Sequence, residues 1–334
     1  MASLISSCIK SSASDDYCVD LRSTSSHLIG CFNSSNSIHT FSLPSLQLSQ
    51  VIPTNTTGVL SEIAIFNENS VFWADRQGKI GLIDFRTGNI VHEFSISEEI
   101  FSIDCSDTNL ATASDKQIKV FDIRNFQEKR NYTELYADDN DITCVRMSPR
   151  QGNVMLSCSE DSLMALCNVD SIEEDDYTLL NVDEPALKVG FCENDIFCVT
   201  INRLVSYNPY FDDPDRPPEV LFRHRLFELQ TQNPELGYFI SEHIGSERVL
   251  LGGSHEGDLY AYNSQNTRNY YVGKGHQGTI RCSVMIQGII ITGGEDSAIL
   301  AWSLQDQPVQ EEHKKVIVPS KIKREKEDRY FKPY

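Results

Sequence analysis

Three stretches of the chain share one pattern: ATASDKQIKVFDIRN (Ala111–Asn125), LSCSEDSLMALCNVD (Leu156–Asp170) and ITGGEDSAILAWSLQ (Ile291–Gln305). Each starts with apolar and small residues, passes through an aspartate, and continues as an alternating apolar run that ends at a bulky side chain. Alternation with a period of two, bounded by turn residues, is typical of half-buried β-strands. The pattern therefore predicts a repeated unit of short antiparallel strands.

Weaker copies of the same pattern fill the rest of the chain. The bulky residue that ends each alternating run serves as a register mark, and the marks are Phe41, Ile83, Phe121, Cys167, Tyr207, Tyr262 and Trp302. Their spacing is about 40 residues, with an insertion of about 15 residues between the fifth and sixth marks. Seven units of four strands each predict an all-β fold, a single seven-bladed β-propeller, in which radial repetition leaves only short sheet edges.

The repeat resembles the WD-repeat family over almost the whole chain. That family places Gly-His before the first strand of a unit and Trp-Asp at the end of the third. Here Gly275-His276 is the one true Gly-His, Trp302 holds the tryptophan, and the following aspartate survives at Asp84 and Asp122. The regular spacing carries the assignment more than any single motif does.

Two longer segments, Asn140–Asp176 and Gly278–Trp302, look like units of the small WD repeat-containing protein 89 family. That resemblance implies a scaffold and adds no chemical mechanism.

A G-x-G-x-x-G motif at Gly273, Gly275 and Gly278 raises the question of nucleotide binding. Such a loop needs a helix that opens at the third glycine, so that the helix N-terminus can hold phosphate. The segment after Gly278 alternates and contains further glycines, which predicts strands. We therefore expect no nucleotide and no other cofactor, and we expect the first two glycines to permit a turn.

The family resemblance implies a structural role for this region instead. It implies a hydrogen-bond network in the last unit, in which a loop histidine bonds an aspartate in the turn between the second and third strands. A threonine on the second strand and a tryptophan on the third complete it. The matching residues are His276, Asp296, Thr292 and Trp302.

Charge divides the chain into two parts. The net charge is −19, yet residues 311–334 hold eight basic and five acidic residues, so that residues 1–310 carry −22. We expect a propeller over residues 1–310, with an insertion near 208–236, and a flexible charged tail over 311–334. An acidic body repels phosphates and favours basic partners, so we expect no direct nucleic-acid binding.

The location of the protein follows from similar arguments. The N-terminal region lacks the apolar core of a secretory signal, and no apolar run is long enough to cross a membrane. The ten cysteines are scattered without a C-x-x-C pair, which predicts reduced, mostly buried thiols. The expected location is cytoplasmic or nuclear, with no membrane contact.

A propeller ring closes when a strand from one end of the chain joins the sheet formed by the other end. Ala2–Lys10 alternates apolar and polar residues, and we expect it to be the outer strand of the last blade. Lys314–Ser320 is the competitor, since Pro319 would suit an edge strand.

Three segments are candidate partner-binding surfaces. The first is the acidic run Asp170–Tyr177, which is a solvated loop or a docking site for a basic segment. Its candidate residues are Glu173, Glu174, Asp175 and Asp176.

The second is the proline-rich insertion. Its middle part, Glu219–Gln230, predicts the fourth strand of the fifth blade followed by a loop, with Phe222, Phe227 and Leu229 in the core and Phe211 as an exposed anchor. The third is the tail, whose aromatic residues Tyr330, Phe331 and Tyr334 follow a basic stretch that would dock on another protein or on the propeller's own acidic face.

No pattern in the sequence supports an enzyme. There is no histidine or cysteine pair at metal-ligand spacing and no G-x-S-x-G elbow. Ser254, His255 and Asp258 lie close together, but neighbouring residues of a tight turn point away from one another. A propeller enzyme would also need convergent polar residues around its central channel, and we expect none there.

The main hypothesis is a non-catalytic scaffold for other proteins, acting as a monomeric propeller within a complex. A sharper form is an acidic platform or chaperone for a basic protein in ribosome biogenesis or chromatin. The alternative is a substrate-receptor subunit of a ubiquitin-ligase complex, because Arg86 and Arg124 stand where WD-repeat receptors place a docking arginine. That alternative requires both arginines to be exposed on one face.

Overall fold

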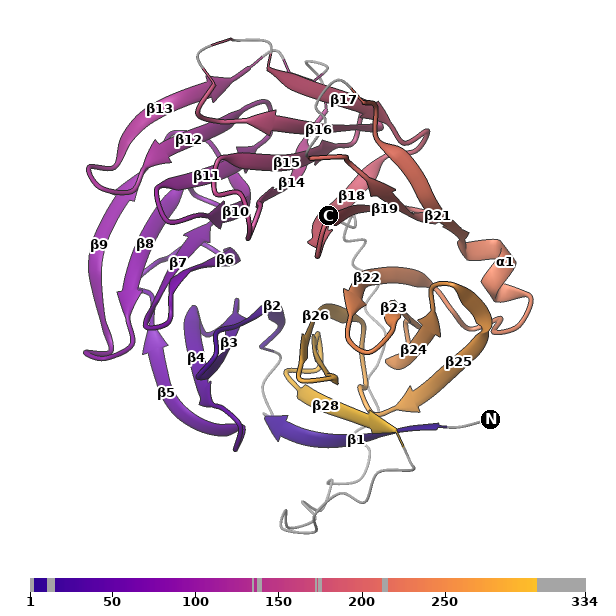
Figure 1. Ribbon diagram of the computed structural model, residues 1–334. Helices are drawn as coiled ribbons and strands as arrows, with labels where there is room; N and C mark the ends of the chain where they lie inside the picture. The colour runs from indigo at the N-terminus through magenta and orange to yellow at the C-terminus, as the bar shows by residue number, and fades with distance from the viewer. Residues whose placement is uncertain are drawn as a thin grey trace, which may run out of the picture.

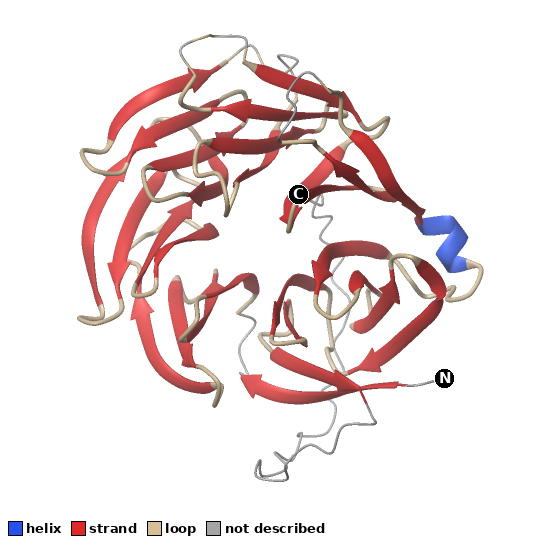
Figure 2. Ribbon diagram, viewed as in Figure 1, coloured by secondary structure: helices blue, strands red, loops and turns tan. Residues whose placement is uncertain are grey.

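The computed structural model is a ring of seven four-stranded antiparallel blades (Figure 1). It describes residues 3–10, 16–133, 135–136, 140–171, 173, 176–211 and 216–304. The seven-bladed propeller predicted from the repeat is therefore confirmed. Almost all of the described chain is strand and turn, with a single short helix (Figure 2).

The strands of the first six blades run outward from the centre of the ring in chain order, and the seventh blade does the same except that its outer strand comes from the N-terminal end of the chain. The first strands are β2 (Cys18–Ser23), β6 (Leu60–Asn67), β10 (Ile100–Cys105), β14 (Ile142–Met147), β18 (Ala186–Cys192), β22 (Tyr238–Ile244) and β26 (Ile280–Ile286). The second strands are β3 (His27–Phe32), β7 (Ser70–Asp75), β11 (Asn109–Ser114), β15 (Val154–Ser159), β19 (Asp195–Thr200), β23 (Arg248–Gly253) and β27 (Ile289–Gly294). The third strands are β4 (Ser37–Ser42), β8 (Lys79–Asp84), β12 (Ile118–Asp122), β16 (Leu163–Asn168), β20 (Arg203–Asn208), β24 (Asp258–Asn263) and β28 (Ile299–Leu304).

The outer strands complete the blades. They are β5 (Gln47–Pro53), β9 (Asn89–Ser95), β13 (Gln127–Tyr132), β17 (Tyr177–Asn181), β21 (Glu219–Arg225), β25 (Asn266–Lys274) and, for the seventh blade, β1 (Ser3–Lys10). The helix α1 (Leu226–Gln230) follows β21.

The register marks of the repeat all fall on third strands. Their exposed fractions range from 0 to 5%, so every one of these bulky side chains is buried. A residue of this kind fills the space between neighbouring blades, which explains why its position repeats while its identity varies.

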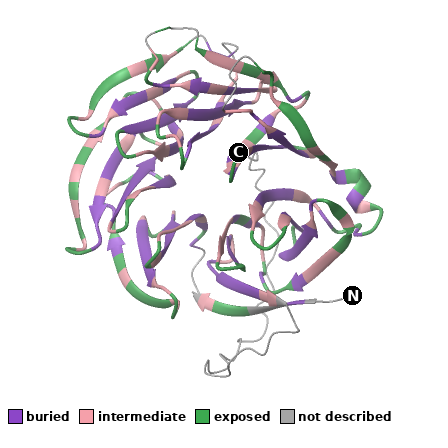
Figure 3. Ribbon diagram, in the orientation of Figure 1, coloured by how far each residue is buried: buried purple, intermediate pink, exposed green. Residues whose placement is uncertain are grey.

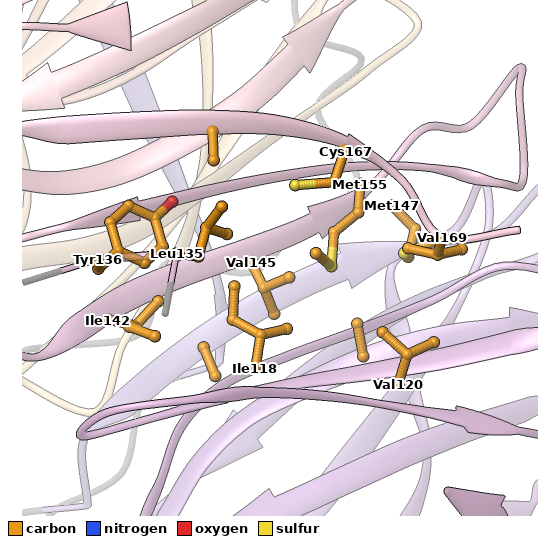
Figure 4. Close-up of a cluster of buried hydrophobic side chains, with 13 residues drawn as sticks. Ile118, Val120, Leu135, Tyr136, Ile142, Val145, Met147, Met155, Cys167 and Val169 are labelled. Atoms are coloured by element: carbon orange, nitrogen blue, oxygen red, sulfur yellow. The ribbon is translucent and has the colours of Figure 1, made fainter. Parts of the chain in front are cut away.

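Blades pack face against face through apolar side chains. Between the third and fourth blades, Ile118 and Val120 of β12 meet Val145 and Met147 of β14 in one buried cluster (Figure 4). Burial is greatest in the inner strands, and exposed residues gather on the outer ones (Figure 3). This gradient is what alternating side chains produce when only the outer strand of a sheet faces water.

The N-terminal strand closes the ring, as predicted. β1 pairs antiparallel with β28, where Leu4 lies opposite Leu304 and Cys8 opposite Leu300. Its first residues also pair in parallel with β25 of the sixth blade, Leu4 with Gly273. The competing segment, residues 314–320, lies outside the described residues.

Candidate functional site

The structure joins the four network residues of the last blade into one chain of hydrogen bonds. His276 precedes β26, and its Nδ1 lies 2.9 Å from Asp296 Oδ1 in the turn between β27 and β28. Its Nε2 lies 2.7 Å from the hydroxyl of Thr292 on β27, and the Trp302 indole N–H of β28 donates to that hydroxyl at 2.7 Å. The network spans the loop and three strands of the blade.

Asp296 also accepts backbone amides from Gln277 at 2.8 Å and Ala298 at 3.2 Å. Burial raises the pKa of this carboxyl, but the bonds from His276 and the amides outweigh burial and hold the pKa below its usual value. A satisfied, ionised carboxylate at this place has a structural role and leaves no group free for chemistry.

The glycine motif near this network has a packing function. Gly273 lies in β25, where an added Cβ would come within 2.4 Å of the Trp302 ring. The expectation that Gly273 permits a turn is therefore wrong, because the residue makes room for an indole. Residues after Gly278 form β26, so the helix required for a phosphate-binding loop is a strand.

Arg86 and Arg124 occupy the same position in the second and third blades. Each lies in the turn between the third and fourth strands, two residues after an aspartate to which its guanidinium donates hydrogen bonds. Arg86 Nε is 3.0 Å from Asp84 Oδ1, and Arg124 Nε is 2.9 Å from Asp122 Oδ1. The Arg124 bonds lower the pKa of Asp122 to about 2.

Both arginine side chains are exposed, at 70% for Arg86 and 77% for Arg124. Because all blades follow the same course, turns of this type lie on one face of the ring. We call this face, which carries the first-to-second and third-to-fourth turns, the lower face, and the other the upper face.

The acidic loop follows β16 of the fourth blade. Glu173 and Asp176 are exposed, while Glu174 and Asp175 lie outside the described residues. Basic residues of the neighbouring blade approach the loop: Lys129 pairs with Asp170, and Arg130 donates to the Glu173 carbonyl at 3.4 Å. Within the described part of the chain, neither Glu173 nor Asp176 makes an ion pair through its carboxylate.

The insertion differs from expectation in four places, and the first is Phe222, which was expected in the core but is only half-buried. The predicted fourth strand is β21, but a helix, α1, follows it where a loop was expected. Leu229 is buried in the core, whereas Phe227 projects from the helix with 60% of its surface exposed. Phe211 is not an exposed anchor, because it is half-buried against Phe191, with ring centroids 6.4 Å apart.

The first strands, which surround the central channel, hold a polar cluster that the sequence reasoning excluded. It is built from Asp20 and Arg22 of β2, Glu62 of β6, Ser102 of β10 and Arg146 of β14. The expectation of no convergent polar residues there is wrong. The missed signal is periodicity, since Asp20, Glu62 and Ser102 stand at one repeat position about 40 residues apart.

Glu62 is the centre of this cluster. Its carboxylate accepts bonds from Ser102 Oγ at 2.5 Å, Ile103 N at 3.0 Å and Arg22 Nη2 at 3.0 Å. Arg146 reaches both of its oxygens. Burial raises the pKa of Glu62, but the two arginines and the Ser102 hydroxyl together outweigh burial and lower the pKa to about 2, so the group is ionised. Fully engaged charges of this kind join blades and leave no free acid or base.

The same repeat position links neighbouring blades elsewhere. Asp20 accepts Ile63 N at 3.3 Å, and Ser102 accepts Val145 N at 3.1 Å. On the other side of the ring, the hydroxyls of Ser241 and Ser283 lie 2.6 Å apart. Side chains of the first strands thus fasten successive blades around much of the channel.

Ser254 and Asp258 form part of the turn between β23 and β24, where the Ser254 hydroxyl accepts the Asp258 amide at 3.0 Å. Among the described residues no group of three or more metal-ligating side chains is arranged to hold an ion, and no helix is long and apolar enough to span a membrane. Tyr330, Phe331 and Tyr334 lie outside the described residues.

Comparison with known proteins agrees with this geometry. WD repeat-containing protein GTS1 of Arabidopsis thaliana is 25% identical over 239 residues, which are 64% of this chain and 60% of that protein. WD repeat-containing protein 89 homolog of Dictyostelium discoideum is 22% identical over 254 residues, which are 72% of this chain and 69% of that protein. The chain is similar to WD-repeat proteins.

No protein-family model matches the chain. The match with GTS1 spans less than two thirds of the length of that relative. WD-repeat propellers generally serve as non-catalytic scaffolds that bind other proteins.

Proposed function

We propose that this WD-repeat propeller is a non-catalytic scaffold whose acidic surface binds a basic protein. The partner class is that of basic proteins in ribosome biogenesis or chromatin, and the proposed location is the cytoplasm or the nucleus. The excess of negative charge over residues 1–310, −22 in total, is the observation that supports this choice.

The acidic loop is the surface that we assign to the partner. Glu173 and Asp176 are exposed and make no ion pair among the described residues, so their charge is available to a partner. Exposed carboxylates steer a basic partner and fix its register more than they add affinity. Binding through them should therefore weaken steeply as salt rises.

To test this, the tagged protein and a Glu173→Lys/Asp176→Lys variant are each purified from cells at low and at high salt, and the proteins that co-purify are identified. We expect basic proteins in the low-salt sample that are lost at high salt and lost in the variant. Glu256→Lys, an exposed acidic site in another blade, is the matched control and should retain them. Recovery of only neutral or acidic partners, indifferent to salt, would overturn the proposal.

A second candidate rests on Arg86 and Arg124, which are exposed at equivalent turns of adjacent blades. Their fixed guanidinium forks present a surface for an adaptor of a ubiquitin-ligase complex. An Arg86→Ala/Arg124→Ala variant should then lose a ligase adaptor that withstands high salt, whereas the exposed Arg268→Ala control should keep it. If the double variant keeps every partner, this candidate is excluded.

A further inference from the structure

An apolar groove of about 480 Å³ lies on the lower face where the first and seventh blades meet. Its lining residues come from the β2–β3, β4–β5 and β26–β27 turns, and the apolar ones are Leu43, Leu46, Met285, Ile286, Ile289 and Ile291. None of the lining side chains carries a charge. The volume is within the range of sites that bind ligands or short apolar segments.

The groove is open to water above an apolar base. Leu43, Leu46 and Ile286 are only partly buried and pack on the core cluster that joins these two blades. Ile289 at the rim is 42% exposed. An apolar surface of this kind gains free energy when a second apolar segment covers it.

The chain itself contains such a segment. The run Lys315–Ser320, KVIVPS, combines β-branched residues with flanking lysines. The outer place in the seventh blade, for which it would be suited, is taken by β1. Short, β-prone apolar runs promote aggregation when they are exposed, so a run of this kind gains from an apolar surface that covers it.

The chain leaves the described fold beside the groove. Trp302 pairs with Ile290, so the last residues of β28 run next to the Gln287–Ile289 turn that lines it. Residues 305–314 can span roughly 33 Å when extended, which is more than enough to bring the apolar run to this site.

We propose that Val316–Val318 dock in this groove of the same molecule. The tail would thus cover the joint at which the ring closes. Charge favours this arrangement: Glu68, which accepts bonds from Ser25 at the groove mouth, offers a carboxylate to the lysines on either side of the run.

Hydrogen exchange on the full chain tests the proposal directly. The amides of Val316–Val318 should exchange at least about tenfold more slowly than in an unstructured peptide. Val318→Asp should abolish this protection and increase exchange in the β4–β5 and β26–β27 turns. Because Val318 belongs to none of the described strands, that variant changes no residue of the described blades and tests docking directly.

Changes in the groove and elsewhere provide the controls. Ile289→Asp should remove tail protection, whereas Ile201→Asp, 51% exposed on the upper face, should leave it intact. Tyr330→Asp/Phe331→Asp should also leave it intact. Unprotected Val316–Val318 amides in the native chain would overturn the proposal, as would protection that is lost on dilution, which would indicate the tail of a second copy.

Discussion

The two tryptophans of the chain stand in different places within two blades of the same design. Trp302 lies on the third strand of the seventh blade and donates its N–H to Thr292 at 2.7 Å. Trp73 lies on the second strand of the second blade, is fully buried, and has no hydrogen-bond partner for its N–H within the described residues.

Both blades nonetheless have a carboxylate where the second strand leads into the third: Asp296 lies in the turn of the seventh blade, and Asp75 is the last residue of β7 in the second blade. In the seventh blade His276 bonds Asp296, whereas in the second blade the Thr56 hydroxyl bonds Asp75. Each carboxylate also accepts the amide two residues further on, Ala298 N at 3.2 Å and Gln77 N at 2.9 Å. The turn needs an acceptor of this kind, while the donor and the aromatic residue can change.

Removal of the turn carboxylates should have the largest effect. Asp75→Ala should lower the free energy of unfolding by about 3 kcal/mol and Asp296→Ala by about 2 kcal/mol, because each leaves buried donors unpaired. Asp75 is fully buried, and Asp296 is partly exposed. Urea unfolding measures both, with the exposed Asp107→Ala as control. Equal values for Asp75→Ala and the control would show that the second blade does not need its carboxylate.

The glycines that face the two indoles come next. A Cβ at Gly81 would lie 2.4 Å from the Trp73 ring, and a Cβ at Gly273 would lie 2.4 Å from the Trp302 ring. Gly81→Ala and Gly273→Ala should each destabilise the protein by about 2 kcal/mol through overpacking.

Double variants sharpen that test. Gly81→Ala with Trp73→Leu should cost less than the sum of the two single changes, because the smaller side chain accepts the methyl group. Gly278→Ala is the control and should change stability little, because an added Cβ there would come no closer than 3.5 Å to any neighbouring atom. If the loss in unfolding free energy of the double variant, measured by thermal and urea unfolding, equals the sum for the two single variants, the predicted clash is contradicted.

The third prediction separates the two indole N–H groups. Trp302→Phe should cost about 1 kcal/mol more than Trp73→Phe, because only Trp302 loses a hydrogen bond. The two changes remove similar volume from buried sites, so the difference between them isolates the bond. A larger cost for Trp73→Phe would contradict this prediction and indicate that the Trp73 N–H is hydrogen-bonded in solution.

The smallest effect is a pH dependence of the seventh blade. A carboxyl whose pKa is lower in the folded than in the unfolded protein stabilises the fold above about pH 3.9, and the benefit is lost as pH falls through the folded value. The pKa of Asp296 is lowered in this way, because its bonds outweigh burial. The difference in unfolding free energy between the native protein and Asp296→Asn should thus shrink below about pH 4.

Urea unfolding between about pH 6 and pH 2.5 measures this difference, with the exposed Val59→Ala as a non-titrating control. A difference that stays constant over this interval would mean that the network does not depend on the ionised carboxylate.

Much of the fold was predictable because the repeat in the sequence follows the pattern of buried side chains in each blade. All seven register marks lie on third strands, and β1 closes the ring at the place where Ala2–Lys10 was expected. Apart from Gly273, which lies in a strand and not in a turn, the errors about the fold lie in the insertion, where one repeat departs from the others. There, Phe227 projects from a five-residue helix and Phe211 is half-buried, because local packing decides these positions and no period constrains them.

The candidate functional residues also fall into those that the sequence predicted and those that it did not. The Asp-x-Arg spacing at Arg86 and Arg124 could be read in the sequence, and the structure adds that both side chains are exposed at equivalent turns. The cluster around Glu62 was missed, because its members come from four successive blades and meet only when these blades pack side by side.

The amino-acid sequence alone determined the number of blades, the third-strand register and the strand that closes the ring, because apolar periodicity reports which side chains are buried. Only the tertiary structure decided which polar side chains meet, where the apolar groove lies and which phenylalanines are exposed. The physical reason is that these properties depend on contacts between blades, and such contacts join residues that are at least one repeat apart in the chain.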